Sequence, residues 1–196
     1  MTTLHRFSRA DLVPTPWKNG GGATREIACW PPGAGLDDFD WRVSIATIAA
    51  SGPFSKFEGV DRTIMLLDGD GVALQGEGVQ HRLDEALQPF AFSGDVALNC
   101  TLLGGASSDF NVMSRRERCT AQVAVIAQAQ ALDAAREGLL LSLHGDWRAG
   151  DETLASGEGL WWADTPRPWT LEPLTPNAAL VAVHWSRRTT TGTQET

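Results

Sequence analysis

Residues 17–26 form the densest group of side chains able to do chemistry, in the order Trp-Lys-Asn-Gly-Gly-Gly-Ala-Thr-Arg-Glu. Three successive glycines open backbone conformations closed to other residues and let the chain approach a bound group closely. Lys18 and Asn19 precede the glycines, and Arg25 and Glu26 follow them. The segment could therefore present cations and backbone N–H groups to a carboxylate or phosphate, although its order is not that of a P-loop. The alternative is a tight turn into a strand, with Arg25 and Glu26 paired on the surface.

A second group lies within residues 39–62, where residues 41–46 alternate bulky apolar side chains with polar or small ones. In an extended strand Arg42 and Ser44 share one face, because successive side chains point to opposite faces. If that face points into a barrel, the guanidinium of Arg42 needs an anionic partner. If it does not, Arg42 is a solvated surface residue. Asp61 and Arg62 are adjacent charges that could simply pair at the start of a strand.

A third group, residues 108–116, has the same alternation. One face of a strand would carry Asp109, Asn111, Met113 and Arg115, and the other face would carry Phe110 and Val112. Positions 115, 116 and 118 are all arginine, a basic cluster in a chain with a net charge of −8. The alternative for this segment is a solvated bend without a binding role.

The composition excludes several classes of protein. A chain of 196 residues with net charge −8 lacks the basic surface that nucleic-acid binding requires. Its three cysteines, Cys29, Cys100 and Cys119, have no paired spacing, which is typical of reduced thiols. The start has no apolar segment of a signal peptide, and no apolar run reaches the roughly 20 residues that span a bilayer. We therefore expect a cytoplasmic protein with no nucleic-acid or membrane partner.

Histidine spacing bears on metal binding. His5, His81, His144 and His184 lie far apart, without a His-x-His or His-x-x-x-His motif. A metal site in a β-barrel needs two or three imidazoles and a carboxylate to converge, so we expect no metal and no other cofactor. The nucleophile motif Gly-x-Ser-x-Gly is absent as well.

Short apolar runs separated by Gly and Asp turns predict an all-β sandwich or barrel. The predicted strands cover residues 41–46, 64–67, 72–74, 96–103, 123–126, 139–143 and 178–185. Residues 127–137 are either one short helix or a loop, and residues 8–13 could form one helical turn capped by Ser8 and Asp11. Similar turn sequences near residues 66–70 and 143–146 hint at two related lobes.

The chain resembles the HutD/Ves family in several motifs that follow one another in the family's order: residues 17–26, 39–46, 52–55, 59–62, 66–69 and 109–115. The resemblance implies a cupin-type β-barrel or jelly roll, duplicated into a bicupin, with very little helix. We expect an N-terminal cupin-like lobe over residues 1–118 and a C-terminal one over residues 119–188 packed on it, with strand exchange between the lobes left open. Residues 189–196 are polar, and we expect a disordered tail.

The same resemblance implies an accessory or regulatory protein of bacterial histidine utilisation, with a formyl- or formimino-glutamate-like ligand. It brings no established catalytic activity. The sequence departs from metal-binding cupins, because it lacks their His-x-His motif and the downstream Glu and His. This departure argues against metal-dependent chemistry.

Our first hypothesis is a metal-independent bicupin that binds a small anionic metabolite, with residues 17–26, 42–44 and 109–115 converging on one cavity. Arginines suit carboxylates because they donate two parallel hydrogen bonds. The cations would be Lys18, Arg25, Arg42, Arg62 and Arg115; the neutral hydrogen-bonding groups would be Asn19, Ser44 and Asn111; the walls would be Trp17, Phe110 and Met113; and Glu26 would be the one acid of the set.

Two alternatives remain open. The protein could be a metal-independent isomerase or lyase acting on a small carboxylate, with Glu26 or His81 as general base. It could instead be an interaction module with a vestigial pocket, in which Trp147, Trp161 or Trp162 marks an exposed partner surface. We expect a binding protein rather than an enzyme, and we leave a homodimer open.

Overall fold

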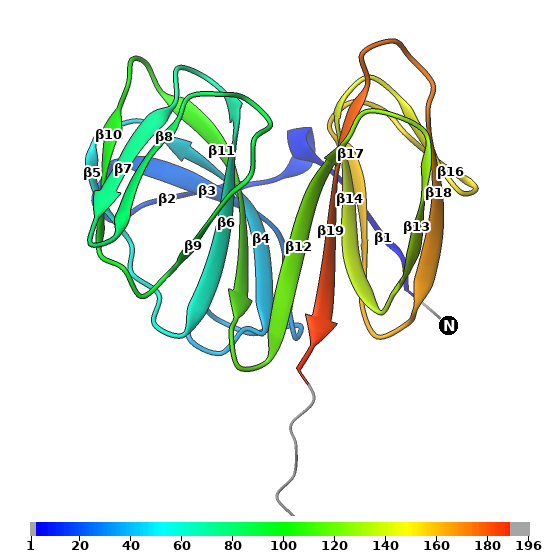
Figure 1. The fold of residues 1–196 in the computed structure, drawn as a ribbon, viewed down its shortest axis with the longest axis horizontal. Coiled ribbons are helices and arrows are strands. Elements are labelled where there is room, and N and C mark those ends of the chain that lie inside the picture. The colour runs from blue at the N-terminus through cyan, green and yellow to red at the C-terminus, as the bar shows by residue number, and fades with distance from the viewer. Residues whose placement is uncertain (1–2, 189–196) are drawn as a thin grey trace, which may run out of the picture.

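The computed structural model describes residues 3–188, which form two lobes built from four antiparallel β-sheets (Figure 1). Within this range the helical content is one 3₁₀ turn, η1 (Arg9–Asp11), whose N-cap Ser8 accepts a hydrogen bond from the Ala10 N–H at 3.3 Å. The prediction of an all-β fold with very little helix is therefore confirmed. Among these residues, no helix has the length and apolar character that crossing a membrane requires. The predicted tail, residues 189–196, lies outside the described residues.

The first lobe, here called the N-lobe, pairs a six-stranded sheet of order β2-β3-β4-β11-β6-β9 with a four-stranded sheet of order β5-β10-β7-β8. Its strands are β2 (Pro14–Pro16), β3 (Gly22–Trp30), β4 (Trp41–Ile48), β5 (Gly52–Phe54), β6 (Val60–Asp68), β7 (Val72–Gly76), β8 (Val79–Leu83), β9 (Phe90–Ser93), β10 (Leu98–Leu102) and β11 (Ser107–Arg115). Ile48, Ile64, Leu66 and Leu74 form part of the apolar core that the two sheets enclose.

The second lobe, the C-lobe, pairs a five-stranded sheet of order β1-β17-β14-β19-β12 with a four-stranded sheet of order β13-β18-β15-β16. Its strands are β1 (His5–Ser8), β12 (Cys119–Ile126), β13 (Gln130–Ala135), β14 (Glu137–His144), β15 (Trp147–Ala149), β16 (Glu152–Leu154), β17 (Glu158–Trp162), β18 (Arg167–Pro173) and β19 (Ala179–Arg187). Its interior is filled by apolar side chains that include Trp147, Trp162 and Trp169.

A third apolar core joins the two lobes, between the six-stranded and the five-stranded sheet. Trp41 of β4 stacks on Trp185 of β19 with ring centroids 4.2 Å apart, and Phe110 of β11 belongs to the same core. One face of β4 and β11 is therefore committed to lobe packing. Because side chains alternate along a strand, the opposite face of both strands points into the N-lobe.

The N-terminal strand crosses from one lobe to the other. β1 pairs with β17 in the C-lobe, and the chain then passes through η1 to β2 in the N-lobe (Figure 1). β12 begins at Cys119 and pairs with β19 along its whole length. β1 thus belongs to a sheet of the C-lobe, although in the sequence it precedes the strands of the N-lobe. A duplication relating the two lobes stays a prediction.

Residues 127–137 are neither the short helix nor the loop considered from the sequence. Residues 130–135 form β13, which pairs with β18 around an irregularity between Leu132 and Ala135. The Ala- and Gln-rich composition favours a helix locally, but pairing with β18 supplies the backbone with partners along the edge of a sheet. Tertiary pairing thus overrides local propensity here.

Candidate functional site

Four neighbouring strands, β3, β4, β11 and β6, bring the predicted motifs onto the inner face of the N-lobe. Residues directly opposite one another on paired strands share a face of the sheet. Two rows of partners cross these strands, the first formed by Glu26, Ser44, Asn111 and Ile64, and the second by Cys29, Arg42, Met113 and Arg62. Segments far apart in the sequence therefore place their polar side chains side by side.

Arg62 is the most unusual member of these rows, because it is only 6 % exposed and forms no ion pair with any residue of 3–188. Its Nη2 donates to the Asn111 Oδ1 at 3.1 Å, and its Nη1 donates to the backbone oxygen of Ser55 at 3.2 Å. Its Nε is buried and has no hydrogen-bond partner in the described chain. Burying a guanidinium without an anion is costly.

Three phenylalanine rings surround the Arg62 guanidinium. Its Cζ lies 4.7 Å from the centroid of Phe54, 5.4 Å from that of Phe57 and 5.1 Å from that of Phe92. Ring faces attract cations, so these contacts compensate part of the desolvation. Burial and then the nearby charge of Arg42 lower the pKa of Arg62 to about 10. The group therefore remains a cation at neutral pH.

Arg42 lies in the same row and is paired. Its Nε donates to the Glu26 Oε2 at 2.6 Å, and its Nη1 lies 4.0 Å from the Met113 Sδ. The Arg42 side chain is 13 % exposed, whereas that of Glu26 is 51 % exposed. Glu26 thus marks the solvent-facing end of the polar rows, and Arg62 the buried end.

Asp109 lies on the same face of β11 as Asn111, two residues earlier, and it is 1 % exposed. Neither of its carboxyl oxygens has a hydrogen-bond partner within residues 3–188, and burial raises its pKa to about 7. Burial, with a contribution from Asp109, raises the pKa of the Cys100 thiol on β10 to about 11. The sequence places Asp109 on this face and within the segment 109–115 expected at the cavity, but Asp109 is not among the predicted ligand-binding residues. The alternation of residues 108–116 was the signal that could have included it.

Two residues of the predicted site lie on the opposite face of the sheet. Arg25 is adjacent to Glu26 and therefore points toward the other lobe, where its Nη1 donates to the Thr47 Oγ1 at 3.3 Å. Phe110 is 1 % exposed and packs in the core between the lobes. Strand alternation places Glu26 and Asn111 on the inner face and their neighbours Arg25 and Phe110 on the other face. Arg25 and Phe110 are therefore removed from the predicted site.

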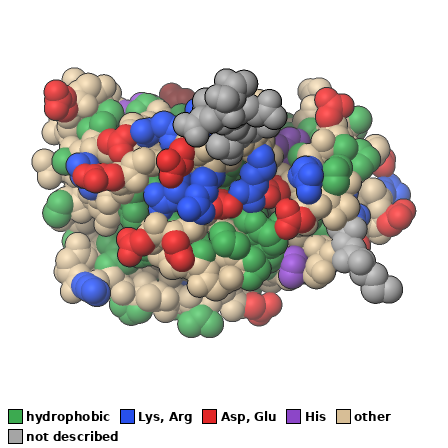
Figure 2. All heavy atoms as spheres, turned by 90° about the horizontal axis from the view of Figure 1, so that it is seen from below, with side chains coloured by type: hydrophobic (Ala, Val, Ile, Leu, Met, Phe, Trp, Pro, Cys, Tyr) green, Lys and Arg blue, Asp and Glu red, His purple; other side chains and the backbone are tan. Residues whose placement is uncertain are grey.

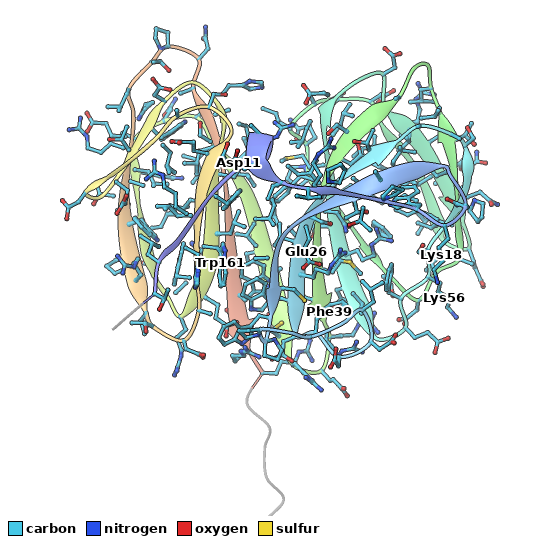
Figure 3. All side chains as sticks on the ribbon, turned by 180° about the vertical axis from the view of Figure 1, so that it is seen from behind. Asp11, Lys18, Glu26, Phe39, Lys56 and Trp161 are labelled. Atoms are coloured by element: carbon cyan, nitrogen blue, oxygen red, sulfur yellow. The ribbon has the colours of Figure 1, made fainter. Side chains whose placement is uncertain are left out.

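The glycine segment builds a turn rather than a ligand cradle. Asn19 accepts a hydrogen bond from the Gly21 N–H at 3.0 Å, and Trp17 donates to the Thr24 Oγ1 at 2.8 Å. Lys18 is exposed and lies at the outer end of the N-lobe, well apart from Glu26 (Figure 3). A side chain at Gly22 would collide with the Thr47 backbone oxygen and the Trp17 ring. Trp17 packs against the N-lobe core, so it supports the fold near the site.

Arg115, at the end of β11, binds the backbone of the loop before β4 and does not contact Arg42 or Arg62. Its Nε donates to the Phe39 backbone oxygen at 3.1 Å and its Nη2 to that of Asp37 at 2.7 Å. Its guanidinium also lies over the Phe39 ring, 5.3 Å from the centroid. The convergence of segments expected from the sequence is therefore found for Glu26, Arg42, Ser44, Asn111 and Met113, with Arg62, and not for Lys18, Asn19 or Arg115.

A second group of charges joins the lobes, and the sequence indicated only its arginine at position 118. Asp40 accepts hydrogen bonds from Arg118 and Arg187, and Glu137 accepts from Arg187 and from the Trp41 Nε1. Seen from below the view of Figure 1, the molecule has basic and acidic side chains gathered side by side across its middle (Figure 2). Burial alone would raise the pKa of Asp40, but its hydrogen bonds with Arg187 and Arg118 outweigh burial and lower it. For Glu137, burial outweighs the hydrogen bond with Arg187, and the pKa is raised.

An open groove of about 350 Å³ lies near Arg62, but it belongs to the other side of the sheet. Its lining includes Asp61, Thr63, Val112 and Thr120, of which the first three alternate with the residues that face the N-lobe interior. Arg62 also contributes to its wall. We base the candidate site on the inner face, because Arg62 and Asp109, two buried charged residues without an ion-pair partner within residues 3–188, lie there.

The surface expected for an interaction module is not formed by the tryptophans named for it. Trp147 and Trp162 are both 0 % exposed inside the C-lobe. Trp161 is half-buried and stacks on His5 with ring centroids 3.8 Å apart. The expectation of exposed tryptophans is therefore wrong for Trp147 and Trp162, because both fill the core between the two C-lobe sheets.

The residues proposed as bases in the enzyme alternative are separated from Arg62. Glu26 is engaged by Arg42. His81 stacks on Phe90 with ring centroids 3.6 Å apart, and Phe90 in turn stacks on Phe92 at 5.8 Å. Two aromatic rings thus lie between the imidazole and the guanidinium. Within residues 3–188, no group of three or more His, Cys, Asp or Glu is arranged to hold a metal ion.

Comparison with known proteins assigns the family. The model of the HutD family matches residues 9–180. The chain belongs to the HutD family. Protein Ves of Citrobacter koseri is 42 % identical to this HutD-family chain over 166 residues, which cover 84 % of this chain and 85 % of that protein. The solved structure of HutD from Pseudomonas fluorescens SBW25 is 32 % identical, with a TM-score of 0.84, and the match covers 95 % of this chain and 100 % of that one.

More distant structures show the fold alone. A cupin 2 conserved barrel domain protein from Leptotrichia buccalis matches with a TM-score of 0.60 at 9 % identity, covering 93 % of this chain and 96 % of that one. This likeness agrees with the expected cupin-type β fold. The HutD-family chain is thus a cupin-like protein that carries charged side chains inside its N-lobe.

Proposed function

We propose that the N-lobe of this HutD-family protein binds a small carboxylate anion, with Arg62 as the principal contact. The observation that carries this proposal is the buried guanidinium of Arg62, which has no anionic partner among residues 3–188 and an Nε without a hydrogen bond. A buried charge is normally paired. A ligand carboxylate would provide the missing partner, and the planar donors of arginine suit it well.

The neighbouring residues have complementary roles in this proposal. Asn111 holds Nη2 of Arg62 and so orients the guanidinium, while Phe54, Phe57 and Phe92 exclude water from it. Excluding water strengthens the attraction between the guanidinium and a carboxylate. Arg42 adds positive charge from the same row, as its lowering of the Arg62 pKa indicates.

We further propose that the protein is an accessory or regulatory factor of histidine utilisation that binds a formyl- or formimino-glutamate-like ligand without a metal. Membership of the HutD family supports this role. Such ligands carry carboxylates, which match the two arginines of the site. Binding without turnover is the expected behaviour, because the candidate bases Glu26 and His81 are held in contacts with Arg42 and Phe90.

The test is isothermal titration calorimetry with N-formyl-L-glutamate as the probe. Arg62→Gln should weaken binding by about 2–5 kcal/mol, the usual cost of truncating one partner of a buried charge pair. Arg148→Gln is the matched control, because Arg148 is an exposed C-lobe arginine paired with Glu172. It should leave the affinity unchanged. Equal affinities of the wild type and Arg62→Gln, or an equal loss in both variants, would contradict the proposal.

A further inference from the structure

The inner face of the N-lobe holds a second buried group without a partner, and it has the chemistry opposite to that of Arg62. Asp109 is 1 % exposed, and neither of its oxygens accepts or donates a hydrogen bond within residues 3–188. The residues opposite it on the paired strands are Ala46 and Leu66, which offer no polar side chain. Burying a carboxyl group without a hydrogen-bond partner costs free energy of folding, and these apolar neighbours do not offset that cost.

The position of Asp109 relative to Arg62 follows from the strand register. Asp109 and Asn111 are two residues apart on one face of β11, which separates their Cα atoms by about 6.5–7 Å. The Asn111 Oδ1 lies 3.1 Å from Nη2 of Arg62. On the inner face, Asn111 therefore lies between an unpaired acid, Asp109, and an unpaired cation, Arg62, whose guanidinium it contacts.

We propose that Asp109 determines specificity at the carboxylate site by accepting a hydrogen bond from a cationic nitrogen of the bound molecule. The ligand class is then a small zwitterion whose carboxylate meets Arg62 and whose protonated nitrogen meets Asp109, with the two groups separated by a short chain past Asn111. This inference rests on the proposed function, because it needs Arg62 to hold the carboxylate. Each buried group would thereby gain the partner of opposite charge that it lacks in the chain itself.

The pairing makes affinity depend on pH in a defined direction. Of the groups that face Asp109, Cys100 of β10 is titratable with a pKa of about 11, and Ala46 and Leu66 are apolar. Arg62, on the far side of Asn111, stays charged. Burial raises the pKa of Asp109 to about 7, so below that pH its carboxyl must lose a proton before it can pair with a cation. Affinity for a zwitterion should therefore rise with pH up to about 7 and then level off.

The experiment compares two probes of equal length, δ-aminovalerate, which carries a carboxylate and an ammonium group, and valerate, which carries the carboxylate alone. For the wild type above pH 7, we expect δ-aminovalerate to bind at least about tenfold more tightly than valerate. Asp109→Asn, which keeps the side-chain shape, should abolish this preference and leave the valerate affinity unchanged. Arg62→Gln should weaken both probes.

The pH profile of the wild type provides a readout that needs no variant. The ratio of the two affinities should increase by up to about tenfold per pH unit below pH 7, since one proton is released on binding of the zwitterion alone. A flat ratio, an unchanged preference in Asp109→Asn, or equal binding of both probes would overturn the role of Asp109 while leaving a carboxylate site at Arg62. Absence of binding for both probes, or binding unaffected by Arg62→Gln, would overturn the proposed function and the inference together.

Discussion

The interiors of the two lobes differ in what fills them, although each lies between two antiparallel sheets. The C-lobe encloses Trp147, Trp162 and Trp169 in an apolar cluster. The N-lobe also has an apolar core, but its inner face carries Arg42, Arg62, Asp109 and Asn111. Apolar filling stabilises a fold, whereas buried unpaired charges lower its stability. On the function proposed above, the C-lobe has mainly a packing role and the N-lobe binds the ligand.

The same distinction separates two groups of charges. At the lobe interface, Asp40 and Glu137 are hydrogen-bonded by Arg118 and Arg187, so each buried acid has a cation. Inside the N-lobe, Arg62 and Asp109 each lack a partner of opposite charge within the described chain. Paired buried charges are explained by the fold itself. On the function proposed above, the unpaired ones are matched by a bound molecule.

The largest expected effect tests how much the apolar interior of the C-lobe contributes to stability. Trp147→Ala should lower the free energy of unfolding by about 3–5 kcal/mol, because it removes a large side chain that is fully buried in the C-lobe. Urea unfolding followed by circular dichroism measures this loss. Leu174→Ala is the control, since Leu174 is an exposed C-lobe residue and should change stability by less than about 0.5 kcal/mol. A similar small change in both variants would show that the C-lobe interior contributes little packing energy.

Two substitutions then compare what a paired and an unpaired buried charge contribute to stability. Glu137→Ala removes the acceptor of Arg187 and of the Trp41 Nε1, and it should cost up to about 3 kcal/mol, a value reduced by the partial exposure of Arg187. Arg62→Met, which replaces an unpaired guanidinium by an apolar side chain of similar length, should leave stability unchanged or raise it. Both are measured by urea unfolding without ligand. A large loss for Arg62→Met would mean that its contacts with Asn111 and the phenylalanines are structural.

The smallest of the three effects is a pH dependence caused by Asp109. Its pKa is about 7 in the folded protein and about 4 when the chain is unfolded, so between these values the folded state binds more protons. Stability therefore decreases as pH rises through this window and is constant above it. Relative to Asp109→Asn, the wild type should lose about 2 kcal/mol between about pH 5 and pH 7. Because Asp40 and Glu137 titrate alike in both proteins, their contributions cancel in the difference. Parallel pH profiles of the two proteins would contradict the raised pKa.

Local alternation was enough to predict part of the site. Arg42 and Ser44 share one face of β4, and Asn111 and Met113 share one face of β11, as their spacing indicates. The same alternation places Phe110 and Arg25 on the other face of the sheet, away from Asn111 and Glu26. Their inclusion in the predicted site therefore departs from the strand pattern. Lys18 and Asn19 are predicted from the glycine-rich motif at residues 17–26, but neither belongs to a strand that faces the N-lobe interior.

Other features depended on contacts between segments that are distant in the sequence. The phenylalanines around Arg62 come from β5, β9 and the segment before β6, and the pairing of Asp40 with Arg187 joins residues of different lobes. β1 lies in the C-lobe because its partner is β17. No local periodicity records which strand becomes the neighbour of which, since hydrogen bonding across strands is decided by the packing of the whole sheet.

The sequence by itself determined the all-β class, because short apolar runs between Gly and Asp turns leave little room for helices. Its motifs also determined membership of the HutD family. Tertiary structure alone decided which charges are paired and which are not, and so which could serve a ligand. The physical reason is that the energy of a charged side chain depends on its solvent exposure and its neighbours. Both properties come from strands that the chain order does not place together.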